Sequence, residues 1–95
     1  MPELSGGAVT FLFSDIEGST RLWELHPETM RDALARHDVL SQTAVATHGG
    51  TVVKTTGDGL YAVFGEPGDA LRATVMLQRA LRDPEATAGI PLRVR

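Results

Sequence analysis

Residues 8–20 read AVTFLFSDIEGST, an apolar run that ends in a carboxylate and then a Gly-Ser-Thr turn. The near-continuous apolar character of residues 8–14 predicts a central β-strand, covered on at least one face and, we expect, on both. Asp15 follows this strand directly, and Ser19 or Thr20 is placed to cap a short helix after the turn. A carboxylate in this position can hold a hard cation beside exposed backbone amides.

A second carboxylate lies in residues 52–64, which read VVKTTGDGLYAVF. Their β-branched and aromatic residues predict two strands, at residues 51–56 and 60–64. Gly57-Asp58-Gly59 predicts the tight turn between these strands, because Asp and Gly tolerate positive φ angles. Asp58 is therefore either a residue that only forms the turn or the second member of a metal-binding pair.

The remaining sequence predicts two longer helices and a last strand. Residues 27–48 carry an apolar stripe at helical spacing, and Gly49-Gly50 ends that helix. Asp69 is a plausible cap for the next helix, which ends at Asp83-Pro84, and a final strand begins near Leu92. The stripe of the first long helix consists of Met30, Leu34, His37, Ser41, Ala44 and His48, broadened by Ala33, Leu40 and Val45.

The order of strand, helix pair, strand, strand, helix and strand predicts an α+β fold. The simplest arrangement is ferredoxin-like: an antiparallel sheet with helices packed on one face, incomplete at the C-terminus. In that layout the first and third strands are antiparallel neighbours, so Asp15 and Asp58 meet at one edge of the sheet. A carboxylate pair beside a glycine-containing helix start suits Mg²⁺ with a nucleoside triphosphate.

Composition restricts the other classes of function. The chain has 95 residues, a net charge of −3 and no cysteine, which predicts one domain in a reducing compartment and argues against a nucleic-acid partner. No signal peptide is evident, and no apolar segment reaches the roughly 20 residues of a membrane helix. We therefore expect a cytoplasmic protein without a membrane partner.

We divide the chain into an N-terminal tail, residues 1–7, and one domain, residues 8–95. Residues 90–95 alternate apolar and basic side chains, which predicts the start of a half-buried strand. Because this pattern stops without a turn or a polar tail, we expect the chain to be part of a longer domain.

Several candidate residues have a simpler interpretation. The simpler role of Asp15 is a helix cap, and that of the loop of residues 16–20 is an ordinary turn rather than a nest of amides for phosphate. Lys54 is either a solvated strand lysine or a contact for a base or phosphate. His37 and His48 are about three helical turns apart, which is too far for one metal ion and indicates packing or surface roles.

Three stretches together resemble a known enzyme family. Residues 9–24, VTFLFSDIEGSTRLWE, are similar to the opening motif of the class III adenylate/guanylate cyclase catalytic domain in its bacterial form. Residues 54–59, KTTGDG, resemble the second metal motif of that family, and residues 64–67, FGEP, fit as well. The resemblance covers residues 8–95, the N-terminal half of such a domain.

The resemblance implies a site and a set of ligands. Two Mg²⁺ or Mn²⁺ ions would be held by Asp15, Asp58 and the carbonyl of Ile16. The amides of Ile16, Glu17, Gly18, Ser19 and Thr20 would surround the triphosphate. Lys54 would read the purine and favour ATP, with Thr56 and Gly57 beside it in the nucleotide-binding motif.

The resemblance also implies a reaction. ATP would be converted to 3′,5′-cyclic AMP and pyrophosphate by two-metal catalysis, in a homodimer with sites at the subunit interface. The groups that stabilise the transition state would lie in the second half of the family domain, so we expect this chain alone to be inactive. Two alternatives are a non-catalytic dimerisation or nucleotide-sensing remnant of a cyclase, and a phosphatase of the haloacid dehalogenase type.

Overall fold

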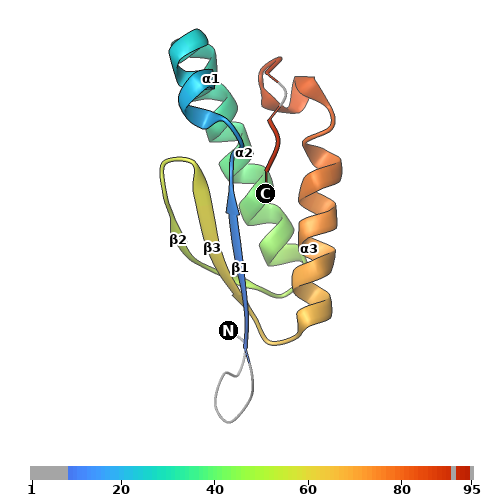
Figure 1. Ribbon diagram of the computed structural model, residues 1–95. Helices are drawn as coiled ribbons and strands as arrows, with labels where there is room; N and C mark the ends of the chain where they lie inside the picture. Colours follow the sequence, from blue (N-terminus) through green and yellow to red (C-terminus); the bar gives the residue numbers. More distant parts are fainter. Residues whose placement is uncertain (1–8, 91, 95) are drawn as a thin grey trace.

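The hairpin of residues 51–64 organises a three-stranded antiparallel sheet. A computed structural model describes residues 9–90 and 92–94, and its strands are β1 (Thr10–Asp15), β2 (Thr51–Thr55) and β3 (Gly59–Phe64). The strand order is β1-β3-β2, so the first and third strands are neighbours as expected (Figure 1). A bulge at Val53 shifts the register of β2 against β3.

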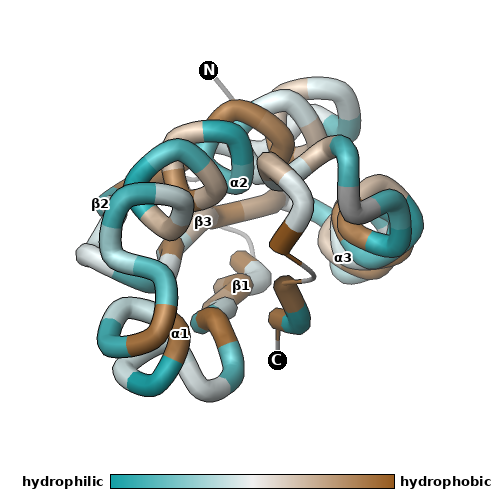
Figure 2. Tube along the Cα trace, turned by 90° about the horizontal axis from the view of Figure 1, so that it is seen from above, coloured by the Kyte–Doolittle hydropathy of each residue, from teal (hydrophilic) through white to brown (hydrophobic). Residues whose placement is uncertain are grey.

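Helices cover one face of this sheet. They are α1 (Ser19–Leu25), α2 (Pro27–Thr47) and α3 (Pro67–Ala80), followed by a single 3₁₀ turn, η1 (Pro84–Thr87). Figures 1 and 2 show α2 and α3 on the same side of the sheet, where α3 contacts β1 and β3 and α2 contacts β2. The α+β prediction with helices on one face is confirmed.

The alternation of β3 places the core between the sheet and these helices. Leu60, Ala62 and Phe64 are buried toward α2 and α3, whereas Tyr61 points to the opposite face and is exposed. Phe64 is fully buried, in a cluster whose other members are Val45, Leu60, Ala62, Ala70 and Ala73. The buried stripe of α2 also matches the predicted face, with Met30, Ala33, His37, Ser41, Ala44 and Val45 inside.

The open face of the sheet corrects the expectation for β1. Phe11 and Phe13 are each 61% exposed, so one face of this strand is covered, and the prediction that both are covered is wrong. Phe13 packs edge-to-face on Tyr61 at a ring-centroid distance of 4.7 Å. An apolar run indicates that a strand will be buried, but it does not identify the surface that buries each face.

The expected helix caps differ from those observed. Gly18 precedes α1 with a φ angle of 68°, a conformation that favours glycine, and no side chain caps this helix. Ser19 and Thr20 instead form the first turn of α1. Asp69 lies in the first turn of α3, where it pairs with Arg72 at 3.0 Å, and Glu66 occupies the cap position.

Of the predicted last strand, the structure describes residues 92–94, which contact the segment that follows β1. Val94 forms an isolated antiparallel bridge with Ile16, and the amide of Glu17 donates to the carbonyl of Arg93 at 2.7 Å. The side-chain amide of Gln78 donates to the carbonyl of Val94 at 3.1 Å, which holds this segment against α3. The predicted tail, residues 1–7, lies outside the described residues. Within the described ranges, no helix has the length and apolar character needed to cross a bilayer.

Candidate metal and nucleotide site

Strand pairing brings the two predicted aspartates together. Asp15 is the register partner of Gly59, the residue after Asp58, and the amide of Ile16 donates to the carbonyl of Asp58 at 2.8 Å. A Cβ atom at Gly59 would lie 2.6 Å from the carbonyl oxygen of Ser14, so this close approach requires glycine. The predicted convergence at one end of the sheet is therefore present.

The side chain of Asp58 is held by a residue far away in sequence. The hydroxyl of Ser19 donates to Oδ2 of Asp58 at 2.8 Å, in a partly buried position. This contact joins the first residue of α1 to the turn between β2 and β3. The sequence placed both residues in the site but assigned the hydroxyl of Ser19 to helix capping, so this hydrogen bond was missed.

Some amides of the loop at residues 16–20 already donate hydrogen bonds within the protein. The amide of Ile16 donates to Asp58 and that of Glu17 to Arg93, so two of the five predicted phosphate-binding amides already have partners. The amides of Gly18, Ser19 and Thr20 follow them along the loop. A phosphate at this loop would thus be met by the second part of the predicted segment, with the exposed side chain of Glu17 at its border.

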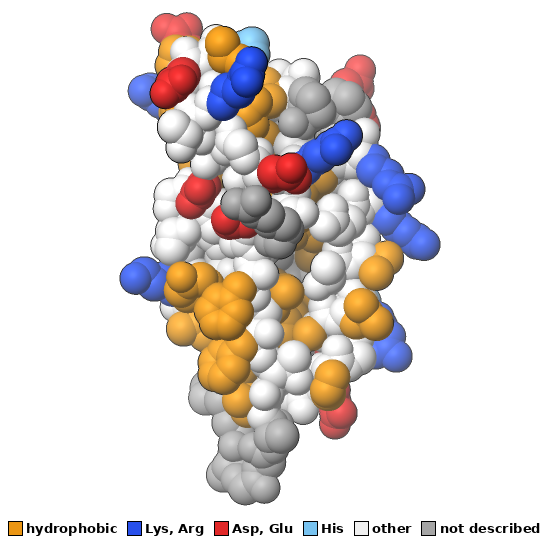
Figure 3. All heavy atoms as spheres, viewed as in Figure 1, with side chains coloured by type: hydrophobic (Ala, Val, Ile, Leu, Met, Phe, Trp, Pro, Cys, Tyr) orange, Lys and Arg blue, Asp and Glu red, His pale blue; other side chains and the backbone are white. Residues whose placement is uncertain are grey.

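Lys54 lies on the open face of the sheet. It is the register partner of Tyr61, which in turn is the partner of Phe13, so the three side chains form one cross-strand row. Asp15 lies two residues further along β1 than Phe13, and Phe13, Ser14, Asp15 and Tyr61 line a shallow hollow. Figure 3 shows the apolar patch on this face, with acidic side chains gathered near one end of it.

The turn itself is closed by its backbone. The amide of Thr56 donates to the carbonyl of Gly59 at 3.0 Å, with Gly57 and Asp58 at the tip. Thr56 and Asp58 are half-buried, whereas Gly57 is exposed. The predicted residues Thr56 and Gly57 therefore shape the turn that carries Asp58.

The oxygen ligands of this site suit a hard cation whose coordination shell is completed by water and substrate phosphates. Two carboxylates and nearby backbone carbonyl oxygens, including that of Ile16, are the ligand types that Mg²⁺ and Mn²⁺ take. Within residues 9–90 and 92–94, no group of three or more His, Cys, Asp or Glu side chains could hold a metal ion. The two carboxylates fit Mg²⁺ as it is commonly bound, through one or two carboxylates with water and substrate phosphates completing the shell.

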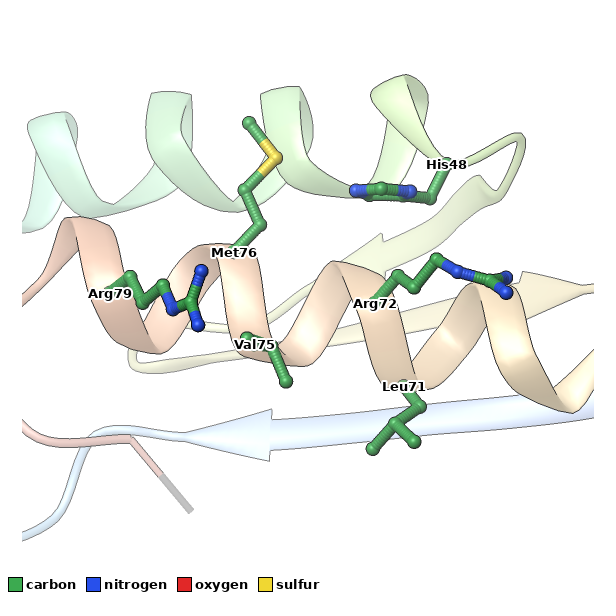
Figure 4. Close-up of a pocket in the computed structure, with 6 residues that line it drawn as sticks. All are labelled: His48, Leu71, Arg72, Val75, Met76 and Arg79. Atoms are coloured by element: carbon green, nitrogen blue, oxygen red, sulfur yellow. The ribbon is translucent and has the colours of Figure 1, made fainter.

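Other clusters in the fold do not have this character. His37 is buried beside Ser41, with Nε2 and Oγ 3.4 Å apart, which confirms its packing role. A hollow between α3 and the end of α2 is lined by His48, which follows α2, and by five residues of α3 (Figure 4): Leu71, Arg72, Val75, Met76 and Arg79. Neither Asp15 nor Asp58 lines this hollow.

Comparison with known proteins identifies a consistent set of relatives. Residues 2–87 match the family model of the adenylate and guanylate cyclase catalytic domain. The chain is 38% identical over 79 residues to an adenylate cyclase of Lachancea kluyveri, covering 83% of this chain and 4% of that protein. It is 37% identical over 91 residues to an uncharacterised protein of Mycobacterium tuberculosis, covering 94% of this chain and 30% of that one.

The solved structures that resemble this chain include cyclases as well. Adenylate cyclases from Trypanosoma brucei, in their monomeric state, match with a TM-score of 0.85 and 29% identity over 99% of this chain and 56% of theirs. The guanylyl cyclase Cya2 matches with a TM-score of 0.73 and 33% identity, over 94% of this chain and 53% of that one. The chain thus spans less than a third of these curated relatives and just over half of the solved domains.

Proposed function

Because the chain belongs to the adenylate and guanylate cyclase catalytic domain family, we propose that it carries the metal- and nucleotide-binding part of an enzyme that forms 3′,5′-cyclic AMP and pyrophosphate from ATP. The observation that carries the proposal is the pairing of Asp15 with Gly59, beside the hydrogen bond from Ile16 to Asp58. It makes neighbours of two carboxylates that are 43 positions apart.

Asp15, Asp58 and the carbonyl of Ile16 would hold two Mg²⁺ or Mn²⁺ ions. When bound, such ions supply positive charge that stabilises the attacking and leaving oxygens of an in-line displacement at phosphorus. The amides of Gly18, Ser19 and Thr20 contact the phosphates. In this arrangement the carboxylates fix the position of the ions, and the loop orients the triphosphate.

The open face of the sheet supports a homodimer. Phe11 and Phe13 are 61% exposed and Tyr61 is 39% exposed, an apolar surface directly beside Asp15. Contiguous exposed apolar surface of this kind marks interaction sites. A second subunit on this face would exclude water from the hollow at Phe13 and Asp15 and would place the nucleotide between the two subunits.

The test of the proposal is titration of the purified chain with ATP in the presence of Mn²⁺, combined with product analysis. Titration calorimetry should detect weak binding of Mn·ATP, and chromatography should detect no cyclic AMP. The reason is that the chain spans only 56% of a solved cyclase domain, and catalysis depends on contacts that strengthen in the transition state. Robust cyclic AMP formation, absent in an Asp15→Ala control, would overturn the expected inactivity, and failure to bind Mn·ATP would overturn the site.

Base preference depends on Lys54. Its ammonium can donate to the acceptors of adenine, so the Lys54→Glu variant should lose its preference for Mn·ATP over Mn·GTP. The expected change is roughly 10-fold in the ratio of the two dissociation constants, equivalent to about 1.4 kcal/mol. Arg31→Glu, an equal charge reversal at an exposed position of α2, is the control. An unchanged ratio in Lys54→Glu would remove this residue from the base site.

A further inference from the structure

The hydroxyl of Ser19 has a role that helix capping does not explain. A capping hydroxyl accepts a hydrogen bond from a backbone amide. The Ser19 hydroxyl instead donates to Oδ2 of Asp58 at 2.8 Å, and α1 has no side-chain cap among the described residues. A donor aimed at one oxygen of a carboxylate fixes the orientation of that carboxylate.

We propose that Ser19 is the positioning residue of Asp58: it holds one carboxylate oxygen so that the other is presented to a divalent cation. This inference rests on the proposed function, because it assigns the cation to the site of Asp15 and Asp58. Mutation of an outer group that orients a metal ligand in this way typically lowers metal affinity by about 10- to 100-fold.

The position of Asp58 explains why its side chain needs an anchor. Its backbone is fixed by the hydrogen bond from Ile16 and by the closure of the turn between Thr56 and Gly59. Neither contact restrains the side chain, which projects from the tip of a hairpin and is only partly buried. A freely rotating carboxylate would lose rotamer entropy when it binds a cation, and the hydrogen bond from Ser19 removes part of that cost beforehand.

The anchor itself is set by the turn that precedes it. Gly18 has a φ angle of 68°, and this left-handed residue directs the chain so that Ser19 becomes the first residue of α1. A Cβ at Gly18 would meet no atom within 4 Å, so the conformation of the backbone, and not space, is what favours glycine there. The backbone conformation of Gly18 therefore places the hydroxyl of Ser19 beside Asp58, in the turn between β2 and β3.

The first arm of the test measures Mn²⁺ binding by calorimetry, without nucleotide. Ser19→Ala should weaken binding by about 10- to 100-fold, and Ser19→Thr, which retains the hydroxyl, should restore most of the affinity. Ser41→Ala is the matched control, because it removes another serine hydroxyl with a side-chain contact, to His37, away from the site. Its Mn²⁺ affinity should equal that of the wild type.

The second arm measures amide hydrogen exchange in the metal-free protein. Loss of the Ser19 anchor should speed exchange in Ser19→Ala, but not in Ser41→Ala, at the amides of Ile16 and Thr56, which donate to the carbonyls of Asp58 and Gly59. If the wild type does not bind Mn²⁺, the metal site of the proposed function is wrong, and so is the assignment of the cation. If the wild type binds Mn²⁺ and Ser19→Ala binds it equally well, only the positioning role is wrong. Equal affinity loss in Ser19→Ala and Ser19→Thr would likewise overturn it, because the hydroxyl would then not be the cause.

Discussion

The double variant Asp15→Asn, Asp58→Asn is expected to lose Mn²⁺ affinity by roughly 100-fold or more, equivalent to at least about 2.7 kcal/mol. Asparagine preserves the size of each side chain and an acceptor oxygen, so the fold and the contact from Ser19 remain available. What is lost is the pair of negative charges that the strand pairing brings to one end of the sheet. Calorimetry with Mn²⁺ alone measures the change.

A matched charge control separates this effect from a general loss of acidity. Asp32→Asn with Asp69→Asn removes the same two charges from positions that pair with arginines on α2 and α3. That control should bind Mn²⁺ as the wild type does. If both double variants lost affinity equally, the ion would be attracted by net charge, and a defined carboxylate pair would be excluded.

The largest effect on stability is expected from Phe64→Ala. The ring is fully buried at the centre of the cluster between β3 and the helices, and a Cβ at Gly50 would lie only 2.5 Å from it, so the ring packs on backbone there. Truncation should cost about 3–5 kcal/mol of unfolding free energy. Small domains have totals of about 5–15 kcal/mol, so the variant should be close to unfolded.

Urea unfolding followed by circular dichroism measures this change, with Phe11→Ala as the control. Phe11 is also a β-strand phenylalanine, but it is 61% exposed on the open face, so its removal should cost less than about 1 kcal/mol. Equal midpoints for the two variants would contradict the assignment of the core to the helix-covered face. The comparison is made at a protein concentration low enough for the chain to be monomeric, because the homodimer proposed on the open face would bury Phe11 and make Phe11→Ala costly.

The convergence of the two aspartates could be predicted because it depends on topology. Two strands joined by Gly57-Asp58-Gly59 and an earlier strand ending at Asp15 allow few sheet orders, and the simplest of them places these residues together. Hydrophobic patterning likewise identified the buried face of α2. Features that follow from periodicity and chain connectivity are thus accessible from sequence.

The role of Ser19 could not be predicted in the same way. Whether a serine hydroxyl accepts from a helix amide or donates to a distant carboxylate depends on where the helix begins, to within one residue. Here the left-handed Gly18 takes the cap position, which moves Ser19 into the helix and turns its hydroxyl toward Asp58. Asp69 was displaced from its predicted cap position for a similar reason, because α3 begins at Pro67 and Glu66 takes the cap position.

The exposed aromatic residues of β1 show a different limit. Phe11 and Phe13 resemble core residues in the sequence, yet they lie exposed on the open face of the sheet. An apolar side chain indicates that it will be buried, but not whether the same chain or another molecule buries it. Residues 90–95 were predicted as the start of a strand from their alternating pattern, and among the described ones Val94 forms a bridge with Ile16. An alternating pattern does not fix how many residues pair.

Mapping bound Mn²⁺ on the folded chain by NMR shows whether the ion binds at Asp15 and Asp58. A paramagnetic ion broadens the amide signals of residues around it, so substoichiometric Mn²⁺ added to ¹⁵N-labelled protein locates the site without any assumption about catalysis. We expect broadening concentrated at residues 15–20 and 56–59, and its loss in the Asp15→Asn, Asp58→Asn variant. Broadening centred elsewhere, or unchanged broadening in that variant, would contradict the claim that these two carboxylates form the metal site.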